Sequence, residues 1–419
     1  MTDREREGWI VVGAIFVTMF FIWGAINSGS VFFVPVLKYF GWSRAKLSIV
    51  FSIGWVTGGA AAPVIGWLAD RVSARQLMIA GAAATGVGWC VLSRADGFPA
   101  FLALNGIFGV SVGLATGIPS TLMITSWFHQ RRGLALGIAF SGSTLGGAAM
   151  TMVSSYAIAF RGWRFGYALL GTPILLLSVP LLIWLARGNP ESTIAAGKRS
   201  AMASNSTVAV ELPGLEIRKA LVNRSFWLIS LALLLGGLSV GMAPHYVAYL
   251  IGLGYSAAFA AGVVSLYLIV TTAGTLLGGP LADRLGARSA MSVSYLLAAL
   301  GMLGMLLARF IPALGLNIVA GGFAGGALSV QMPLITIESL GLKRLGSLLG
   351  ITSVFFTLGA ATGPIIAGRI FDVTTSYTIA ISTFLVILLM CSAAILGCQP
   401  LAPAEKKTSE LRSVAVGEE

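Results

Sequence analysis

The sequence predicts an all-α membrane protein whose twelve transmembrane helices form two six-helix bundles related by a pseudo-two-fold axis. Three observations lead to this fold class. The composition is too apolar for a water-soluble domain, apolar stretches of membrane-spanning length follow one another along the chain, and the second half repeats the motifs of the first half at a constant spacing.

The composition indicates a lipid bilayer as the surrounding solvent. Of the 419 residues, 57% are hydrophobic and 10% are charged, whereas a soluble domain carries about 25% charged residues. The 53 glycines suit helices that approach closely in lipid. The net charge of +12 comes from short basic clusters between apolar runs, which is typical of membrane orientation and not of nucleic-acid binding. Because Cys90, Cys391 and Cys398 lie in apolar stretches without metal-ligand spacing, we expect no metal and no cofactor.

Apolar stretches of spanning length place the helices, since a helix needs about 20 apolar residues to cross a bilayer. Twelve stretches fit: 10–35, 45–69, 76–94, 98–124, 133–158, 164–186, 226–252, 257–282, 289–308, 311–337, 346–370 and 375–397. The charged start of the chain lacks a small-residue cleavage site, so we expect the first helix to be retained. The domains predicted are an N-terminal bundle (1–186), a polar cytoplasmic linker (187–223), a C-terminal bundle (224–398) and a cytoplasmic tail (399–419).

An internal repeat relates the two halves. The segment Gly66–Arg71 (GWLADR) recurs 213 residues later as Gly279–Arg284 (GPLADR), and Gly133–Ile138 (GLALGI) recurs at the same offset as Gly346–Ile351 (GSLLGI). Repeats in the same orientation imply an axis along the membrane normal.

The basic residues predict the orientation of the chain in the membrane. With both termini in the cytoplasm, 19 of the 27 Lys and Arg residues lie on the cytoplasmic side, which agrees with the excess of positive charge on that side of membrane proteins. The other eight are Lys38, Arg44, Lys46, Arg94, Arg161, Arg164, Arg309 and Arg369. We therefore expect a multi-pass protein of the cell's inner (plasma) membrane.

The Gly-x-Leu-Ala-Asp-Arg-x-x-x-Arg loop after the second helix, and its copy after the eighth, resemble the signature loop of the major facilitator superfamily. The resemblance implies a carrier whose two six-helix bundles rock around a central cavity. We expect the protein to be a monomer. It also implies that Asp70 lies near the start of helix 11, and Asp283 near the start of helix 5, when the protein is open to the outside. A helix start favours an anion there. The alternative is a solvated turn that only sets topology.

The residues expected to form this gate on the cytoplasmic side are Asp70, Arg71, Arg75, Arg131, Arg132, Asp283, Arg284, Arg288 and Glu338. Glu338 is the only carboxylate in a predicted helix outside the loops and helix ends. A carboxylate within a membrane needs a partner, so we expect Arg284 or Arg288 beside it. A glutamate at headgroup level that faces water is the alternative.

One segment resembles a narrower group within the superfamily. Trp127–Gly142, with its aromatic residues, paired arginines and regularly spaced small residues, resembles the entry to helix 5 in monocarboxylate transporters and oxalate/formate antiporters. Glu7-Gly8-Trp9 is a looser similarity. Where that group often has a substrate-binding Arg and a proton-coupling Asp, this chain has Thr275 and Thr271, and Asn27 stands where animal members have a Lys. Either neutral donors hold the anion, or the substrate is not a simple carboxylate.

Polar neutral side chains are therefore the candidates for substrate binding. Tyr267, Thr271 and Thr275 recur every four residues and share one helix face. The full candidate set is Asn27, Ser30, Thr116, Ser120, Ser141, His245, Tyr249, Tyr267, Thr271, Thr275 and Gln331. His245 is the one group inside a predicted helix that titrates near neutral pH, so it could carry a coupled proton. The alternative for His245 is a structural histidine bonded to a neighbouring helix.

These features predict a secondary active transporter that moves a small organic anion by alternating access. Proton symport is the coupling that the family resemblance implies, while exchange and uniport stay open. No Gly-x-x-x-x-Gly-Lys-Ser/Thr motif occurs, so the energy must come from gradients. The competing interpretations are an exporter or facilitator of a neutral or amphipathic solute, and a membrane sensor of the same fold. An enzyme is not expected, because no nucleophile–base spacing is found in the loops.

Overall fold

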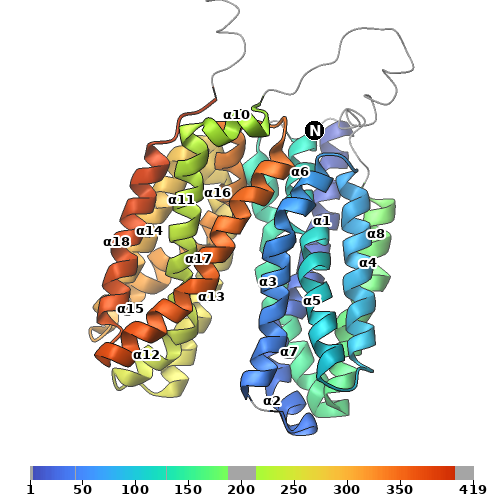
Figure 1. The fold of residues 1–419 in the computed structure, drawn as a ribbon, viewed down its shortest axis with the longest axis vertical. Helices are drawn as coiled ribbons and strands as arrows, with labels where there is room; N and C mark the ends of the chain where they lie inside the picture. Colours follow the sequence, from blue (N-terminus) through green and yellow to red (C-terminus); the bar gives the residue numbers. More distant parts are fainter. Residues whose placement is uncertain (1–2, 43, 129, 187–213, 402–419) are drawn as a thin grey trace, which may run out of the picture.

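The computed structural model describes residues 3–42, 44–128, 130–186 and 214–401. The helices up to α8 lie together in one bundle, and those from α11 onward lie together in a second bundle beside it (Figure 1). We call these the first half and the second half. The end of the molecule that carries the N-terminus and α10 is called the linker end.

The first half contains six spans, three of which are interrupted. Its elements are α1 (Asp3–Asn27), α2 (Gly29–Phe40), α3 (Arg44–Ala69), α4 (Ala74–Leu92), α5 (Phe98–Ala115), α6 (Gly117–Trp127), α7 (Arg132–Pro173), a π-helical turn (Ile174–Ser178) and α8 (Val179–Trp184). Thr116, whose backbone is extended, separates α5 from α6 within one span, and Gly117 then begins α6 with φ +51°. Non-helical backbone at Arg161 and Gly162 divides α7 into two spans that meet at the end opposite the linker.

The second half repeats this arrangement after a short helix in the linker. Its elements are α10 (Ile217–Val222), α11 (Arg224–Ser239), a 3₁₀ turn (Val240–His245), α12 (Tyr246–Gly252), α13 (Ala257–Leu285), α14 (Ala287–Leu306), α15 (Ile311–Leu316), a π-helical turn (Asn317–Gly321), α16 (Gly322–Leu340), α17 (Leu345–Thr374) and α18 (Thr378–Leu396). Pro244 lies within the 3₁₀ turn and fits this interruption, because proline lacks a backbone N–H.

The predicted fold class is confirmed. Ten stretches of the described chain are long and apolar enough to cross a membrane. The longest of them, Arg132–Trp184, contains the break in α7 and so comprises two spans, and α4 supplies the twelfth. The first span was predicted as residues 10–35, which is too short at both ends. Its helical segments begin at Asp3 and end at Phe40. Hydropathy marks the part of a helix that lies in lipid, whereas backbone hydrogen bonding continues into the polar interface.

The halves meet where α3 crosses α17 and where α7 crosses α13. Glycine pairs make both crossings possible. A Cβ atom added at Gly66 would lie 2.1 Å from the carbonyl oxygen of Gly346, and one added at Gly133 would lie 2.1 Å from that of Gly279. The two pairs are equivalent under the 213-residue repeat. Backbone-to-backbone packing of this kind needs residues without a side chain, and it brings the halves into contact toward the linker end.

Candidate functional site

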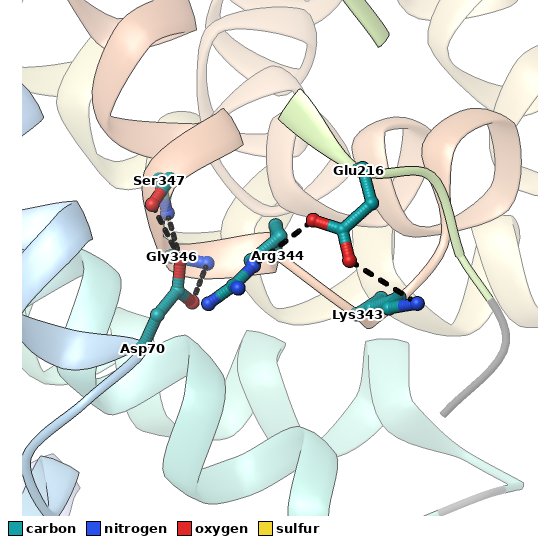
Figure 2. Close-up of polar contacts among 6 residues, drawn as sticks. All are labelled: Asp70, Glu216, Lys343, Arg344, Gly346 and Ser347. Carbon is teal, nitrogen blue, oxygen red and sulfur yellow. Dashed lines mark hydrogen bonds and ion pairs between the residues drawn. The ribbon is translucent and has the colours of Figure 1, made fainter. Parts of the chain in front are cut away.

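The first contact between the halves at the linker end is made by Asp70, which follows α3. Its Oδ1 accepts the N–H of Gly346 at 2.9 Å, and its Oδ2 accepts the N–H of Ser347 at 2.9 Å and the hydroxyl of Ser347 at 2.5 Å (Figure 2). Gly346 and Ser347 lie in the first turn of α17, where backbone N–H groups have no partner within the helix. The carboxylate therefore meets both free donors and the positive end of the helix dipole.

The second contact is the repeat equivalent of the first. Asp283, near the end of α13, accepts the N–H of Gly133 at 2.8 Å and the N–H of Leu134 at 3.0 Å, in the first turn of α7. Leu134 occupies the position of Ser347 and has no hydroxyl to donate. The contacts implied by the family resemblance are thus present in both halves, with three hydrogen bonds at Asp70 and two at Asp283.

The local sequence explains how Asp70 reaches across. After Ala69 the chain leaves α3 in a turn in which Asp70 and Arg71 still donate to carbonyls of the last helical turn, at 3.2 and 3.0 Å. Gly66 lies one turn earlier, at the crossing with α17, so the backbones are already in contact there. Closeness of the backbones allows a side chain as short as aspartate to reach the helix start.

Three of the six arginines predicted for the gate contact groups of their own half. Arg71 stacks on Trp67, one turn earlier in α3, with its guanidinium carbon 3.9 Å from the ring centre. Arg75 donates to the carbonyls of Leu182, at 3.2 Å, and Ile183, which end the last span of the first half. Such a cation complements a helix C-terminus. Arg132 donates to the carbonyl of Phe128 at 2.7 Å. Arg131 and Arg284 are exposed, and Arg288 is half-buried.

The partner of Glu338 differs from the predicted Arg284 or Arg288. Its carboxylate accepts the N–H of Ala287 at 2.5 Å, at the start of α14, so this expectation is corrected. A helix start offers unpaired N–H groups that the sequence pattern of charges does not display. Glu338 therefore caps a helix within the second half and does not join the two halves.

Glu216 is a functional candidate that the sequence analysis missed. Its carboxylate lies 3.1 Å from Lys343 Nζ and 3.3 Å from Arg344 Nε, immediately before α17 (Figure 2). Hydrogen bonds from these two cations lower the pKa of the exposed Glu216 carboxyl. The sequence offered one indication of its importance, since Glu216 is the only acidic residue between residues 214 and 227.

Among the predicted substrate-binding residues, four hydroxyls donate to a carbonyl in the preceding turn of their own helix. They are Thr116, Ser141, Thr271 and Thr275. Ser120 is fully buried, with its hydroxyl 3.9 Å from the sulfur of Met78. Hydroxyls often return such a bond to the helix, which uses the O–H donor and not the oxygen lone pairs.

Three longer side chains tie helices of the second half together. Tyr249 donates to the carbonyl of Met305 at 2.9 Å, and Tyr267 donates to that of Gly321 at 3.1 Å. Gln331 is fully buried and donates to a carbonyl of α13 at 3.2 Å, while its Oε1 has no partner among the described residues. These bonds tie α12 to α14, and α13 to the span that contains α16.

His245 bridges three helical segments. Its Nε2 lies 3.1 Å from the carbonyl oxygen of Pro364 in α17, and its Nδ1 lies 3.1 Å from the hydroxyl of Tyr377, next to α18. A carbonyl only accepts, so Nε2 carries the proton and Nδ1 of a neutral ring accepts from Tyr377. Asn27 is exposed beside Gly147 of α7, and the side chain of Ser30 lies outside the described part of the structure. The hydrogen bonds named for the predicted substrate residues stay within one half, and their contact with substrate remains a prediction.

Two bundles of six spans, joined at one end by repeat-related contacts between a carboxylate and a helix start, define a class of multi-pass membrane transporter. The family model of the Major Facilitator Superfamily matches residues 14–314 and 252–416, and the chain belongs to this superfamily. It is therefore a transporter of small solutes and not an enzyme.

Three similar proteins illustrate the relationship. The chain is 28% identical over 340 residues to the 3-(3-hydroxy-phenyl)propionate transporter of Escherichia coli (strain K12), covering 80% of both chains. It is 26% identical to monocarboxylate transporter 13 of Bos taurus, covering 88% of this chain and 84% of the relative. A solved structure of the proton:xylose symporter bound to 6-bromo-6-deoxy-D-glucose has a TM-score of 0.71 at 14% identity, covering 93% of this chain and 95% of the symporter. The resemblance to monocarboxylate transporters is confirmed.

Proposed function

We propose that this chain is a secondary active transporter that moves a small organic anion of the monocarboxylate type by alternating access. The observation that carries the alternating-access part is the pair of contacts made by Asp70 and Asp283 between the halves. Both consist of hydrogen bonds to helix-start N–H groups, which water can replace when the halves separate. Breaking them therefore costs only about 0.5–3 kcal/mol for each bond, which suits a gate that opens and closes.

In this proposal the linker end is the cytoplasmic end, as the excess of Lys and Arg there supports. The structure, with that end in contact, then corresponds to a state closed to the cytoplasm. The N-terminal bundle (1–186) and the C-terminal bundle (224–398) would rock as two bodies within a monomer of the cell's inner membrane. The linker (187–223) and the tail (399–419) would lie in the cytoplasm.

Two relatives support an organic anion as the substrate, because the names of both refer to carboxylates. Thr271 and Thr275 stand where the resemblance to the monocarboxylate group leads us to expect charged residues. Their hydroxyls, now bonded to the helix, can turn to donate to a carboxylate, since a bond to a charged acceptor is about twice as strong as the one given up. The bound anion would then be held by neutral donors.

A neutral solute is the second candidate. It is favoured by the same threonines, which leave α13 without a buried charge at these positions, and the fold is shared with a symporter of a neutral sugar. A neutral substrate would need hydrogen-bonding side chains but no cation.

Counterflow in proteoliposomes tests the proposal. Vesicles loaded with 3-(3-hydroxyphenyl)propionate, lactate, pyruvate or xylose are diluted into labelled solute at pH about 6 and about 8, on either side of the usual histidine pKa. We expect accumulation for one or more carboxylates and none for xylose. Accumulation of xylose alone would favour the neutral-solute candidate. Vesicles without the protein are the control for leak.

Proton coupling is tested in the same vesicles with an imposed pH gradient. If His245 carries the proton, His245→Gln loses the gradient-driven accumulation but keeps counterflow. Unchanged gradient-driven uptake in His245→Gln would leave His245 with its structural role between α17 and Tyr377.

A further inference from the structure

Residues 214–222, which we call the strap, cross the linker end of the second half and contain α10 (Figure 1). The inner face of the strap is fixed to the protein. The N–H of Leu215 donates to the carbonyl of Leu340 at 2.9 Å, and Glu216 pairs with the two cations that precede α17. Ala220 is fully buried in an apolar cluster with the end of α16 and the start of α17. The strap is thus held as a defined surface element.

The outer side of the strap exposes large apolar side chains. Leu221 is 41% exposed and Val222 is 86% exposed. Beside them Trp227, in the first turn of α11, is 52% exposed. The indole N–H of Trp227 donates to the carbonyl of Leu221 at 2.8 Å, which keeps the ring next to the strap. These three residues form a contiguous apolar patch, and such patches mark a binding surface.

Within residues 214–227, the exposed charges beside this patch are all positive. Arg218, Lys219 and Arg224 are exposed next to the apolar side chains. The only acid in residues 214–227 is Glu216, whose charge is taken up by Lys343 and Arg344 on the inner side. The outer side is therefore both apolar and cationic, which is complementary to an anionic, amphipathic surface.

The position of the patch selects the bilayer over a protein partner. A membrane-spanning stretch begins at Arg224, so the patch lies at the depth where α11 leaves the lipid. Tryptophan and basic side chains concentrate at this depth, and basic side chains there attract anionic headgroups. Trp227 belongs both to the patch and to the spanning helix, so the patch lies directly beside the start of that helix.

We propose that the outer side of the strap, with Arg224 and Trp227, binds anionic phospholipid of the leaflet at the linker end. The apolar side chains enter the acyl boundary, and the three cations contact phosphate groups. This binding does not depend on which solute is transported.

Labelling of Val222→Cys in lipid nanodiscs tests the proposal on the full chain. The discs contain phosphatidylcholine alone or with about one third phosphatidylglycerol, and a polar maleimide reacts from solution. Labelling at residue 222 is quantified by peptide mass spectrometry, which separates it from the three native cysteines. We expect labelling to be about five-fold slower with phosphatidylglycerol. Ser73→Cys, exposed at the start of α4 in the first half, is the matched control and should label equally in both discs.

A charge-neutral variant separates the lipid effect from folding. Adding Arg218→Gln, Lys219→Gln and Arg224→Gln changes exposed side chains only, and should equalise the labelling of residue 222 between the two discs. Native mass spectrometry of the unaltered protein, which needs no variant, should show retained phosphatidylglycerol. Equal labelling of Val222→Cys in both discs before those changes would overturn the proposal. Slow labelling in both discs would do the same, because protection of the patch would then not depend on anionic lipid.

Discussion

The two contacts between the halves share one design but differ in strength. At both, an aspartate that follows a glycine crossing accepts the first N–H groups of a helix in the other half. The contact at Asp70 adds the hydroxyl of Ser347, and Glu216 organises the residues just before that helix. The contact at Asp283 has Leu134 in place of the serine. Both contacts therefore have the hydrogen bonds from backbone N–H groups to the aspartate, and only the contact at Asp70 has an additional side-chain donor. We expect the contact between α3 and α17 to contribute more of the energy barrier to opening.

Glycine substitutions at the crossings should have the largest effect. A Cβ atom at Gly279 would lie 1.8 Å from the carbonyl oxygen of Gly133, and one at Gly66 would lie 2.1 Å from that of Gly346. Backbone cannot move aside as a flexible side chain does, so the cost should reach or exceed the upper end of the about 1–3 kcal/mol of ordinary overpacking. We expect Gly279→Ala and Gly66→Ala each to lower the counterflow rate about tenfold or more. Gly262→Ala, where nothing lies within 4 Å, is the control and should transport normally.

Removing the carboxylates should come next and should separate the two contacts. Hydrogen bonds to a charged group contribute about 1.5–3 kcal/mol when fully formed and less when exposed. We expect Asp70→Asn to destabilise the closed linker end by about 3 kcal/mol and Asp283→Asn, whose aspartate is exposed, by about 1–2 kcal/mol. Distances between spin labels at Ser73→Cys and Ser289→Cys, exposed in opposite halves, report the closed fraction.

Arg71→Gln is the matched control for this pair, because Arg71 stacks on Trp67 of its own half. Equal effects of the two aspartate substitutions would show that the additional bond at Asp70 has no energetic weight.

Removing the hydroxyl of Ser347, which has no counterpart at Leu134, should sharpen the comparison further. Ser347→Ala removes one hydrogen bond to Asp70 and should reduce the closed fraction by an amount equivalent to about 1 kcal/mol. In the Ser347→Ala background, the effect of Asp70→Asn should fall toward that of Asp283→Asn. Ser353→Ala is the control, since that hydroxyl bonds to a carbonyl of its own helix. If neither Ser347→Ala nor Ser353→Ala changes the closed fraction, the hydroxyl of Ser347 does not stabilise the closed state.

The smallest effect is expected from pH at Glu216. Its pKa is lowered below the usual 4.5 by hydrogen bonds from Lys343 and Arg344. A depressed pKa means that the stabilising contribution is complete above pH 4.5 and is lost as the pH falls through the lower value of the folded protein. Glu216→Gln should therefore lower the Tm slightly at neutral pH, with the difference from the unaltered protein vanishing in acid. Because the pair is exposed, salt should also reduce the difference. If the difference in Tm between Glu216→Gln and the unaltered protein is the same at neutral and at acid pH, the ion pair is not its source.

The sequence predicted the spans, the repeat and the two aspartate contacts, but not the finer partners of the site. Each span satisfies its own backbone hydrogen bonds, so apolar length alone reveals it. The constant offset of 213 residues then paired Asp70 with Asp283 and Gly133 with Gly346. The same offset aligns Ser347 with Leu134, so the sequence shows that the two equivalent positions differ. It does not show that the hydroxyl of Ser347 faces Asp70.

The amino-acid sequence by itself determined that the protein lies in a lipid bilayer, and it determined the twelve spans, the repeat of the two halves and the family. These properties follow from local composition and spacing. Only the tertiary structure decided that Glu338 caps α14, that Arg75 closes the end of α8, that Glu216 holds Lys343 and Arg344, and that Asp70 has one donor more than Asp283. Those partners are separated by many residues along the chain, up to 277 for Asp70 and Ser347. They are set by the rotation and depth at which packed helices meet, which no local pattern encodes.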